Sequence, residues 1–246
     1  MSGRRTSGRL IGIGVGPGDP ELMTLKATRA LAEADLLVHF AKTGSMSHAR
    51  TIAAGHIKAD TPELPLFYPM TSERPRNGTC YRDAMREFYD HAAATLAAEL
   101  DAGRAVAVIC EGDPLFYGSY MHLHVRLAPR YPTQVIAGVT GMSGCWSAVG
   151  APIAQGDDVF MVLPATLEEA ELERRLKDAD AAVVMKLGRH LPKIRRTLAR
   201  IGRLERAIYV ERGSTQSAVM MRLADKPDDA APYFAVVLVP GWEKRA

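Results

Sequence analysis

Four glycines alternate with other residues where the first apolar segment of the chain ends, at positions 12, 14, 16 and 18. Residues 9–14 predict a short buried strand. Asp19-Pro20 then predicts a helix start, because aspartate caps helix N-termini and proline fits the first turn. Glycine has no Cβ, so its backbone can adopt positive φ and come close to a ligand. This stretch therefore predicts a strand, a tight loop and a helix, with a ligand held against the loop.

The loop does not match a dinucleotide-binding turn. That turn needs the spacing Gly-x-Gly-x-x-Gly, but the third position falls on Pro17 when counted from Gly12 and on Asp19 when counted from Gly14. A carboxylate at a helix N-terminus also repels a phosphate that would otherwise bind there. A nicotinamide oxidoreductase is therefore disfavoured.

Two more loops of the same kind follow predicted strands. The apolar run 105–110 leads into Glu-Gly-Asp-Pro at 111–114, and the segment 134–137 leads into the glycine-rich stretch 138–146. A buried parallel strand presents its carboxyl end to a ligand crevice. None of the three loops contains lysine or arginine. They predict a neutral or cationic ligand, such as a sulfonium cofactor with an adenosine and an amino-acid tail.

Composition and cysteine usage narrow the class of protein. The chain has 246 residues, is 47% hydrophobic and carries a formal net charge of +3, which is too little for a nucleic-acid-binding arm. Cys80, Cys110 and Cys145 are scattered, and His122 and His124 point to different faces of a predicted helix. No apolar run approaches the ~20 residues of a membrane span, and no leader is recognisable. We expect a cytoplasmic protein with no metal site and with neither nucleic acid nor membrane as a partner.

Strands and helices are predicted to alternate along the chain, which is typical of an α/β fold. The predicted strands are 9–14, 36–40, 105–110, 134–137, 159–163, 181–186, 207–211, 218–223 and 234–239; the predicted helices are 20–34, 81–102, 119–127, 142–149, 167–177 and 191–200. The proline-rich segment 60–78 predicts an irregular loop with an exposed tip at 71–79. We predict two α/β domains, 1–120 and 121–246, with antiparallel strands in the second sheet.

Three motifs, at 14–27, 111–119 and 138–146, resemble those of the tetrapyrrole (corrin/porphyrin) methylase family, and the match extends over nearly the whole chain. Phe40-Ala41-Lys42, 111–123 and 143–146 are most similar to the branch of that family that methylates C20 of precorrin-2 in cobalamin biosynthesis. Other precorrin carbons, a cobalt-bearing substrate, an RNA ribose methylase of the same fold and a non-catalytic tetrapyrrole carrier remain alternatives.

The resemblance implies S-adenosyl-L-methionine bound in a cleft between the two domains, a tetrapyrrole as the small-molecule substrate, and a homodimer. Carried over by motif, the cofactor-binding residues are Gly16, Pro17, Gly112, Asp113, Phe116, Tyr117, Thr140, Gly141, Met185 and Gly213. The residues of the substrate trough are Gly18, Asp19 and Phe40, on the side of the N-terminal domain. Purely structural roles remain open for Asp113 as a helix cap, Met185 as a buried strand residue and Gly213 as a turn.

No catalytic base is identified. Relatives that act on uroporphyrinogen carry an aspartate after the second strand, where this chain has His39-Phe40. Lys42, Glu111 and Tyr117 are the remaining candidates for removing the proton from a methylated meso carbon. The basic cluster 189–203 is either a solvated helix face or a binding site for substrate carboxylates.

Overall fold

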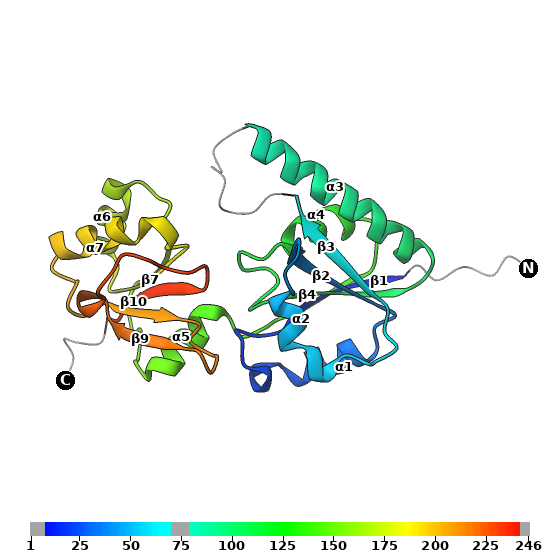
Figure 1. The fold of residues 1–246 in the computed structure, drawn as a ribbon, viewed down its shortest axis with the longest axis horizontal. Helices are drawn as coiled ribbons and strands as arrows, with labels where there is room; N and C mark the ends of the chain where they lie inside the picture. Colours follow the sequence, from blue (N-terminus) through cyan, green and yellow to red (C-terminus); the bar gives the residue numbers. More distant parts are fainter. Residues whose placement is uncertain (1–7, 70–78, 242–246) are drawn as a thin grey trace, which may run out of the picture. The chain divides into compact units, whose positions relative to one another are not determined.

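A computed structural model of the chain describes residues 8–69 and 79–241. The chain divides between Thr140 and Gly141 into two compact units, each built on its own five-stranded sheet (Figure 1). The fold class predicted from the sequence, two α/β sheets with antiparallel strands in the second, is confirmed.

The sheet of the first unit is entirely parallel. Its strands, in the order β3-β2-β4-β1-β5, are β1 (Arg9–Gly14), β2 (Leu36–Lys42), β3 (Glu63–Tyr68), β4 (Ala105–Cys110) and β5 (Thr133–Ile136). The three inner strands are covered on both faces and read as nearly continuous apolar runs, as buried parallel strands do. This explains why β1 and β4 could be recognised from the sequence with their observed bounds.

Helices cover both faces of the first sheet. The helices α1 (Leu25–Ala32) and α2 (His48–Ile52) pack on one face, and α3 (Thr79–Asp101) and α4 (Tyr120–Leu127) on the other (Figure 1). The short 3-10 helices η1 (Pro20–Leu22) and η2 (Ala54–His56) flank α1 and α2. Gly12 allows α4 to pack closely on β1, because a Cβ at this position would lie 2.4 Å from the ring of the fully buried Tyr120.

The sheet of the second unit is mixed. Its strands, in the order β6-β7-β10-β8-β9, are β6 (Phe160–Pro164), β7 (Ala181–Met185), β8 (Ile208–Glu211), β9 (Val219–Arg222) and β10 (Ala235–Val239), and only β6 and β7 are parallel neighbours. The helix α5 (Gly141–Val149) packs on one face, and α6 (Glu169–Asp178) and α7 (Leu191–Arg200) pack on the other (Figure 1). The short 3-10 helices η3 (Gly188–His190) and η4 (Leu223–Asp225) complete this unit.

The predicted domain boundary at 120/121 is wrong. The strand β5 pairs with β1, and residues of α4 lie in the core beside β1, β2 and β4, so both elements belong to the first unit. The predicted helix 20–34 is also wrong as a single element. Asp19 caps η1 by accepting a hydrogen bond from the Glu21 N–H, and Thr24 caps α1 separately by accepting one from the Ala27 N–H.

The predicted loop 60–78 is wrong for residues 63–68, which form the edge strand β3. Proline is tolerated in an edge strand because its missing N–H does not interrupt a ladder on both sides, and Pro65 lies in register with His39. The helix α2 was not predicted. The expected loop tip falls outside the described residues except for Thr79, which begins α3.

Candidate active site

The three glycine-rich loops meet at the carboxyl-terminal edge of the first sheet. A Cβ on Gly14 would lie 2.5 Å from the carbonyl oxygen of Gly112 and 2.6 Å from the nitrogen of Gly138. A Cβ on Gly138 would lie 2.1 Å from the same Gly112 oxygen. Real Cβ atoms do not approach backbone this closely, so glycine is required for the loops to meet.

Hydrogen bonds hold the loops together. The Gly112 N–H donates to the Gly16 carbonyl at 2.7 Å, and Gly16 and Gly112 both have positive φ. Asp113 accepts from the Gly138 N–H through Oδ2 at 3.2 Å and from the Leu115 N–H through Oδ1 at 2.9 Å. Asp113 therefore joins the second loop to the third, a structural role beyond the cap weighed from the sequence.

The meeting point coincides with a topological switch point. The neighbouring strands β1 and β4 lead to α1 and α4, which lie on opposite faces of the sheet. The chain thus leaves two adjacent strands in opposite directions. In open α/β sheets, ligands bind outside the carboxyl ends of the strands at such a point.

The remaining predicted residues of the first unit lie on or beside these loops. Pro17, Gly18 and Asp19 follow β1; Phe116 and Tyr117 follow β4, with their rings edge to face at 5.0 Å; Thr140 follows β5 and precedes Gly141, the first residue of α5. The structure brings the loops together, and contact of these residues with a cofactor stays a prediction.

Strained backbone occurs at three positions in or next to the predicted site residues of the two units. Among the described residues, three non-glycine residues have left-handed φ values: Tyr117 (56°), Lys186 (59°) and Arg212 (47°). Each follows a strand, and each is, or directly adjoins, a residue predicted to bind the cofactor. Such conformations cost of order 1–3 kcal/mol each and concentrate at functional sites. No sequence pattern announced Lys186 or Arg212.

In the second unit, Met185 ends β7 and Gly213 lies just after β8, and these two strands end at the same edge of the sheet. Both β7 and β8 are antiparallel to β10, so they run parallel to each other. Met185 is the last residue of β7. A Cβ on Gly213 would lie 2.8 Å from the Cα of Cys145, so close packing of α5 accounts for this glycine. Cofactor contact of Met185 and Gly213 stays a prediction.

Glu111 has the most perturbed carboxyl group in these loops. It directly follows β4, and burial raises its pKa to about 7, although a hydrogen bond from the Ala49 backbone opposes the shift. None of the described ion pairs includes it. A carboxyl group that titrates near neutral pH is suited to proton transfer.

Phe40 lies in an aromatic cluster on the α3–α4 face of the sheet. Its ring stacks on Tyr68 at 5.6 Å and lies 6.3 Å from the ring of Tyr89. Ser119, before α4, lies within hydrogen-bond distance of the hydroxyls of both tyrosines, at 2.5 and 3.2 Å. Lys42 ends β2 and is exposed.

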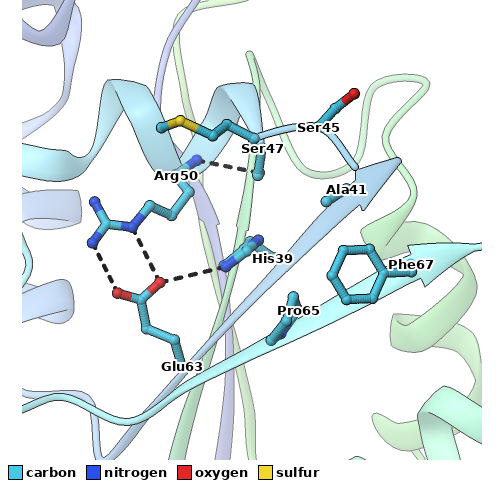
Figure 2. Close-up of a pocket in the computed structure, with 9 residues that line it drawn as sticks. His39, Ala41, Ser45, Ser47, Arg50, Glu63, Pro65 and Phe67 are labelled. Atoms are coloured by element: carbon cyan, nitrogen blue, oxygen red, sulfur yellow. Dashed lines mark hydrogen bonds and ion pairs between the residues drawn. The ribbon is translucent and has the colours of Figure 1, made fainter. Parts of the chain in front are cut away.

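A separate pocket of about 300 Å³ opens on the other face of β2 (Figure 2). Arg50 donates to both Glu63 carboxylate oxygens, at 3.1 and 2.8 Å, and His39 Nε2 lies 3.4 Å from Glu63 Oε2. Burial lowers the pKa of His39 despite the nearby carboxylate. The two hydrogen bonds to Glu63 already pair the guanidinium of Arg50. None of the predicted site residues lines this pocket.

The basic cluster 189–203 is largely engaged inside the second unit. Lys193 donates to the Leu167 carbonyl, Arg195 to the carbonyls of Lys226 and Asp228, Arg196 and Arg200 to Glu169, and Arg203 to the Ala179 carbonyl. These bonds favour the solvated, structural interpretation over recognition of substrate carboxylates.

The described part of the chain offers neither a metal centre nor a helix that could span a membrane. Within residues 8–69 and 79–241, no three His, Cys, Asp or Glu side chains gather in a way that could hold a metal ion. No described helix combines the length and the apolar character needed to cross a bilayer.

Comparison with known proteins places these features in one family. The model of the tetrapyrrole (corrin/porphyrin) methylases matches residues 9–225. The precorrin-2 C(20)-methyltransferase of Sinorhizobium sp is 59% identical over 238 residues, which cover 97% of each chain. The cobalt-precorrin-2 C(20)-methyltransferase of Salmonella typhimurium is 28% identical over 241 residues, covering 96% of this chain and 98% of that one.

A solved structure shares the two-sheet fold. The uroporphyrin-III C-methyl transferase of Thermus thermophilus, complexed with S-adenyl homocysteine, is 25% identical and superposes with a TM-score of 0.63, covering 94% of this chain and 97% of that one. The resemblance that the three motifs indicated is thereby confirmed over nearly the full length. The chain belongs to the tetrapyrrole (corrin/porphyrin) methylase family.

Proposed function

We propose that this enzyme transfers a methyl group from S-adenosyl-L-methionine to C20 of precorrin-2, giving precorrin-3A in cobalamin biosynthesis. The observation that carries the proposal is the meeting of three glycine-rich loops without lysine or arginine at the switch point between β1 and β4. A cationic sulfonium cofactor suits such loops better than a phosphate does. The substrate is proposed from the relative of 59% identity.

The residues present fit the cofactor. Backbone packed so tightly that a Cβ would clash leaves peptide N–H and C=O groups as the lining of the loops. Gly16, Pro17, Gly112, Asp113, Phe116, Tyr117, Thr140, Gly141, Met185 and Gly213 are proposed to hold it. Gly18, Asp19 and Phe40 are proposed to face the tetrapyrrole.

The chemistry places few covalent demands on the protein. S-adenosyl-L-methionine supplies an electrophilic methyl group, and the electron-rich meso carbon of the substrate is already nucleophilic. The loops would hold the cofactor and orient its methyl group toward that carbon, and such positioning lowers the entropic part of the barrier. The aromatic cluster around Phe40 excludes water, which favours a step that neutralises charge.

After methyl transfer, the proton on C20 has to leave, and its C–H electron pair returns to the conjugated system. Glu111 directly follows β4, at the edge where the loops meet, and its raised pKa of about 7 keeps part of the population ionised at neutral pH. We propose Glu111 as the base ahead of Lys42 and Tyr117.

We further propose a metal-free substrate and a homodimer in the cytoplasm. The relative named for precorrin-2 is twice as similar in sequence as the one named for its cobalt complex, 59% against 28% identity.

Cys110 and Cys145 are free thiols, as is usual in a reducing compartment. Light scattering on the purified chain tests the dimer, which would be contradicted by a monomer mass at micromolar concentration.

The deciding experiment uses S-adenosylmethionine with a ¹³C-labelled methyl group and precorrin-2 with and without cobalt. We expect the label on C20 of the metal-free substrate, located by NMR. Label on another carbon, transfer only to the cobalt complex, or transfer only to RNA would each overturn the proposed function. S-adenosylhomocysteine should raise the Tm in the presence of EDTA, following RT ln(1 + [L]/Kd).

A further inference from the structure

A pocket of about 330 Å³ opens between α3 and α4, and three guanidinium groups line it. Its main lining residues are Tyr81, Arg82, Arg86, Tyr89, His122 and Arg126. Positions 82, 86 and 89 form one stripe of α3, and positions 122 and 126 form one stripe of α4, because residues three or four apart lie on the same side of a helix. No carboxylate is among the described lining residues, so the pocket favours an anion.

The arginines differ in how far they are neutralised. Arg86 pairs with Asp83 at 2.6 Å, and Arg126 pairs with Asp90 at 2.7 Å while donating to the His122 carbonyl at 2.9 Å. Arg82 has neither an ion pair nor a hydrogen bond among the interactions of the described residues. Among the described residues, the charge of Arg82 therefore has no counter-ion, and it lies beside the guanidinium of Arg126, which is already held in position.

The aromatic wall connects this pocket to the predicted substrate side. Tyr89 is 5% exposed, the ring of His122 stacks on it at 4.1 Å, and the guanidinium of Arg126 lies 5.9 Å from its ring centre. Burial and Arg126 lower the pKa of His122, so its imidazole adds no charge at neutral pH. The ring of Tyr89 also lies 6.3 Å from that of Phe40.

We propose that the α3–α4 pocket binds a carboxylate side chain of the tetrapyrrole substrate, with Arg82 and Arg126 as its charged donors. This inference rests on the proposed function, which supplies a polycarboxylate ligand. Guanidinium groups bind carboxylates through two parallel N–H···O bonds and stay charged at all working pH values. The sequence offered the cluster 189–203 as a binding site for substrate carboxylates, but its cations are largely occupied by hydrogen bonds within the second unit. In this proposal, Arg82 and Arg126 bind the substrate carboxylate instead.

The test compares Arg82→Gln, Arg82→Lys and Arg82→Gln/Arg126→Gln with the wild type. Arg29→Gln is the matched control, because Arg29 is exposed on α1 on the other face of the same sheet. KM and kcat are measured with precorrin-2, and the Kd of uroporphyrin III, a stable tetrapyrrole with carboxylate side chains, is measured by fluorescence. Circular dichroism and the Kd of S-adenosylhomocysteine report on the fold and on the cofactor site.

We expect Arg82→Gln to raise KM and the Kd of uroporphyrin III about tenfold with little change in kcat, and the double variant to raise both about a hundredfold. Arg82→Lys should recover part of the loss. Added salt should weaken uroporphyrin binding less in the double variant than in the wild type, because fewer charges remain to be screened. Arg29→Gln should behave like the wild type.

The outcomes separate this inference from the proposed function. If the wild type methylates precorrin-2 and the natively folded double variant keeps wild-type KM and Kd, the pocket proposal is overturned and the function stands. If the wild type does not methylate precorrin-2 but Arg82→Gln alone weakens uroporphyrin binding, the function fails and the pocket remains a carboxylate site. Equal losses in Arg82→Gln and Arg29→Gln would also overturn the pocket, because the effect would then be one of net charge.

Discussion

The carbonyl oxygen of Gly112 occupies the space that a side chain at Gly138 would need, since a Cβ added to Gly138 would lie 2.1 Å from it. Two loops more than twenty residues apart in the chain are thus in backbone contact, and Asp113 reinforces the contact by accepting from the Gly138 N–H. Direct backbone packing therefore holds these two loops against each other.

Gly138→Ala should therefore destabilise the enzyme by at least ~2 kcal/mol, because overpacking against backbone cannot be relieved by a change of rotamer. Gly55→Ala is the control, since nothing lies within 4 Å of a Cβ at Gly55; its effect should stay within ~0.5 kcal/mol. Urea unfolding monitored by circular dichroism measures both. Equal stability of the two variants would contradict the close contact of the loops.

Phe40→Asp should lower kcat/KM for precorrin-2 about tenfold or more, which corresponds to ~1.4 kcal/mol or more of lost transition-state stabilisation. A carboxylate in the aromatic cluster with Tyr68 and Tyr89 would bring water with it and repel the carboxylates of the substrate. The affinity for S-adenosylhomocysteine, measured by calorimetry, should change little. Phe40→Leu keeps the site apolar and loses only the ring contacts, worth ~0.5–1.5 kcal/mol, so identical kinetics of the two variants would refute the assignment.

Glu111→Gln should stabilise the protein at pH 8 and not at pH 4. Burial raises the pKa of Glu111 to about 7, so its protonated form is favoured in the folded state. That stability is present at low pH and is lost as the pH rises from ~4.3, the usual value for glutamate, to 7. Removing the charge should therefore gain ~3–4 kcal/mol above pH 7.

Urea unfolding of Glu111→Gln at the two pH values checks this prediction, with Glu21→Gln, at an exposed position, as control. If Glu111 is the proton acceptor, kcat should also fall and lose its dependence on ionisation near pH 7. A stability difference that is the same at pH 4 and pH 8 would show that burial does not perturb this carboxyl group.

His39→Gln should make the protein less sensitive to mild acid. Burial lowers the pKa of His39 below its usual ~6.5, so the neutral imidazole is favoured in the folded state. Its contribution to stability is present above ~6.5 and is lost as the pH falls towards the lowered value. The Tm of the wild type should therefore drop more steeply than that of the variant between pH 7 and pH 5.

Glu63 adds a second loss at lower pH. The hydrogen bond from Arg50 lowers its pKa, so its contribution disappears only when the carboxylate protonates below its usual range. Both proteins should show this later decrease in Tm. Parallel Tm curves between pH 7 and pH 5 would show that His39 does not titrate differently in the folded state.

Local pattern was enough for the buried elements and for the family. The strands β1 and β4 and the helix α7 have the bounds that the sequence predicts, because continuous apolar runs and a regular amphipathic stripe are local signals. The glycine spacing excluded a dinucleotide turn for a local reason as well, since one missing glycine is visible in the chain itself. The three motifs identified the family before any contact between them was known.

Long-range packing decided the rest. The strand β3 carries Pro65 and becomes a strand only because it lies at the sheet edge beside β2, and the unit boundary moved to 140/141 because β5 pairs with β1. The raised pKa of Glu111 follows from burial, which the sequence cannot report. The sequence offered the dense basic cluster 189–203 as a binding site for substrate carboxylates. In the folded chain, hydrogen bonds inside the second unit largely occupy those cations. The α3–α4 pocket is lined instead by arginines from two separate helices. Whether a cation is available to bind a ligand depends on which helix faces meet and on how far each cation is already paired, and both are properties of the folded chain.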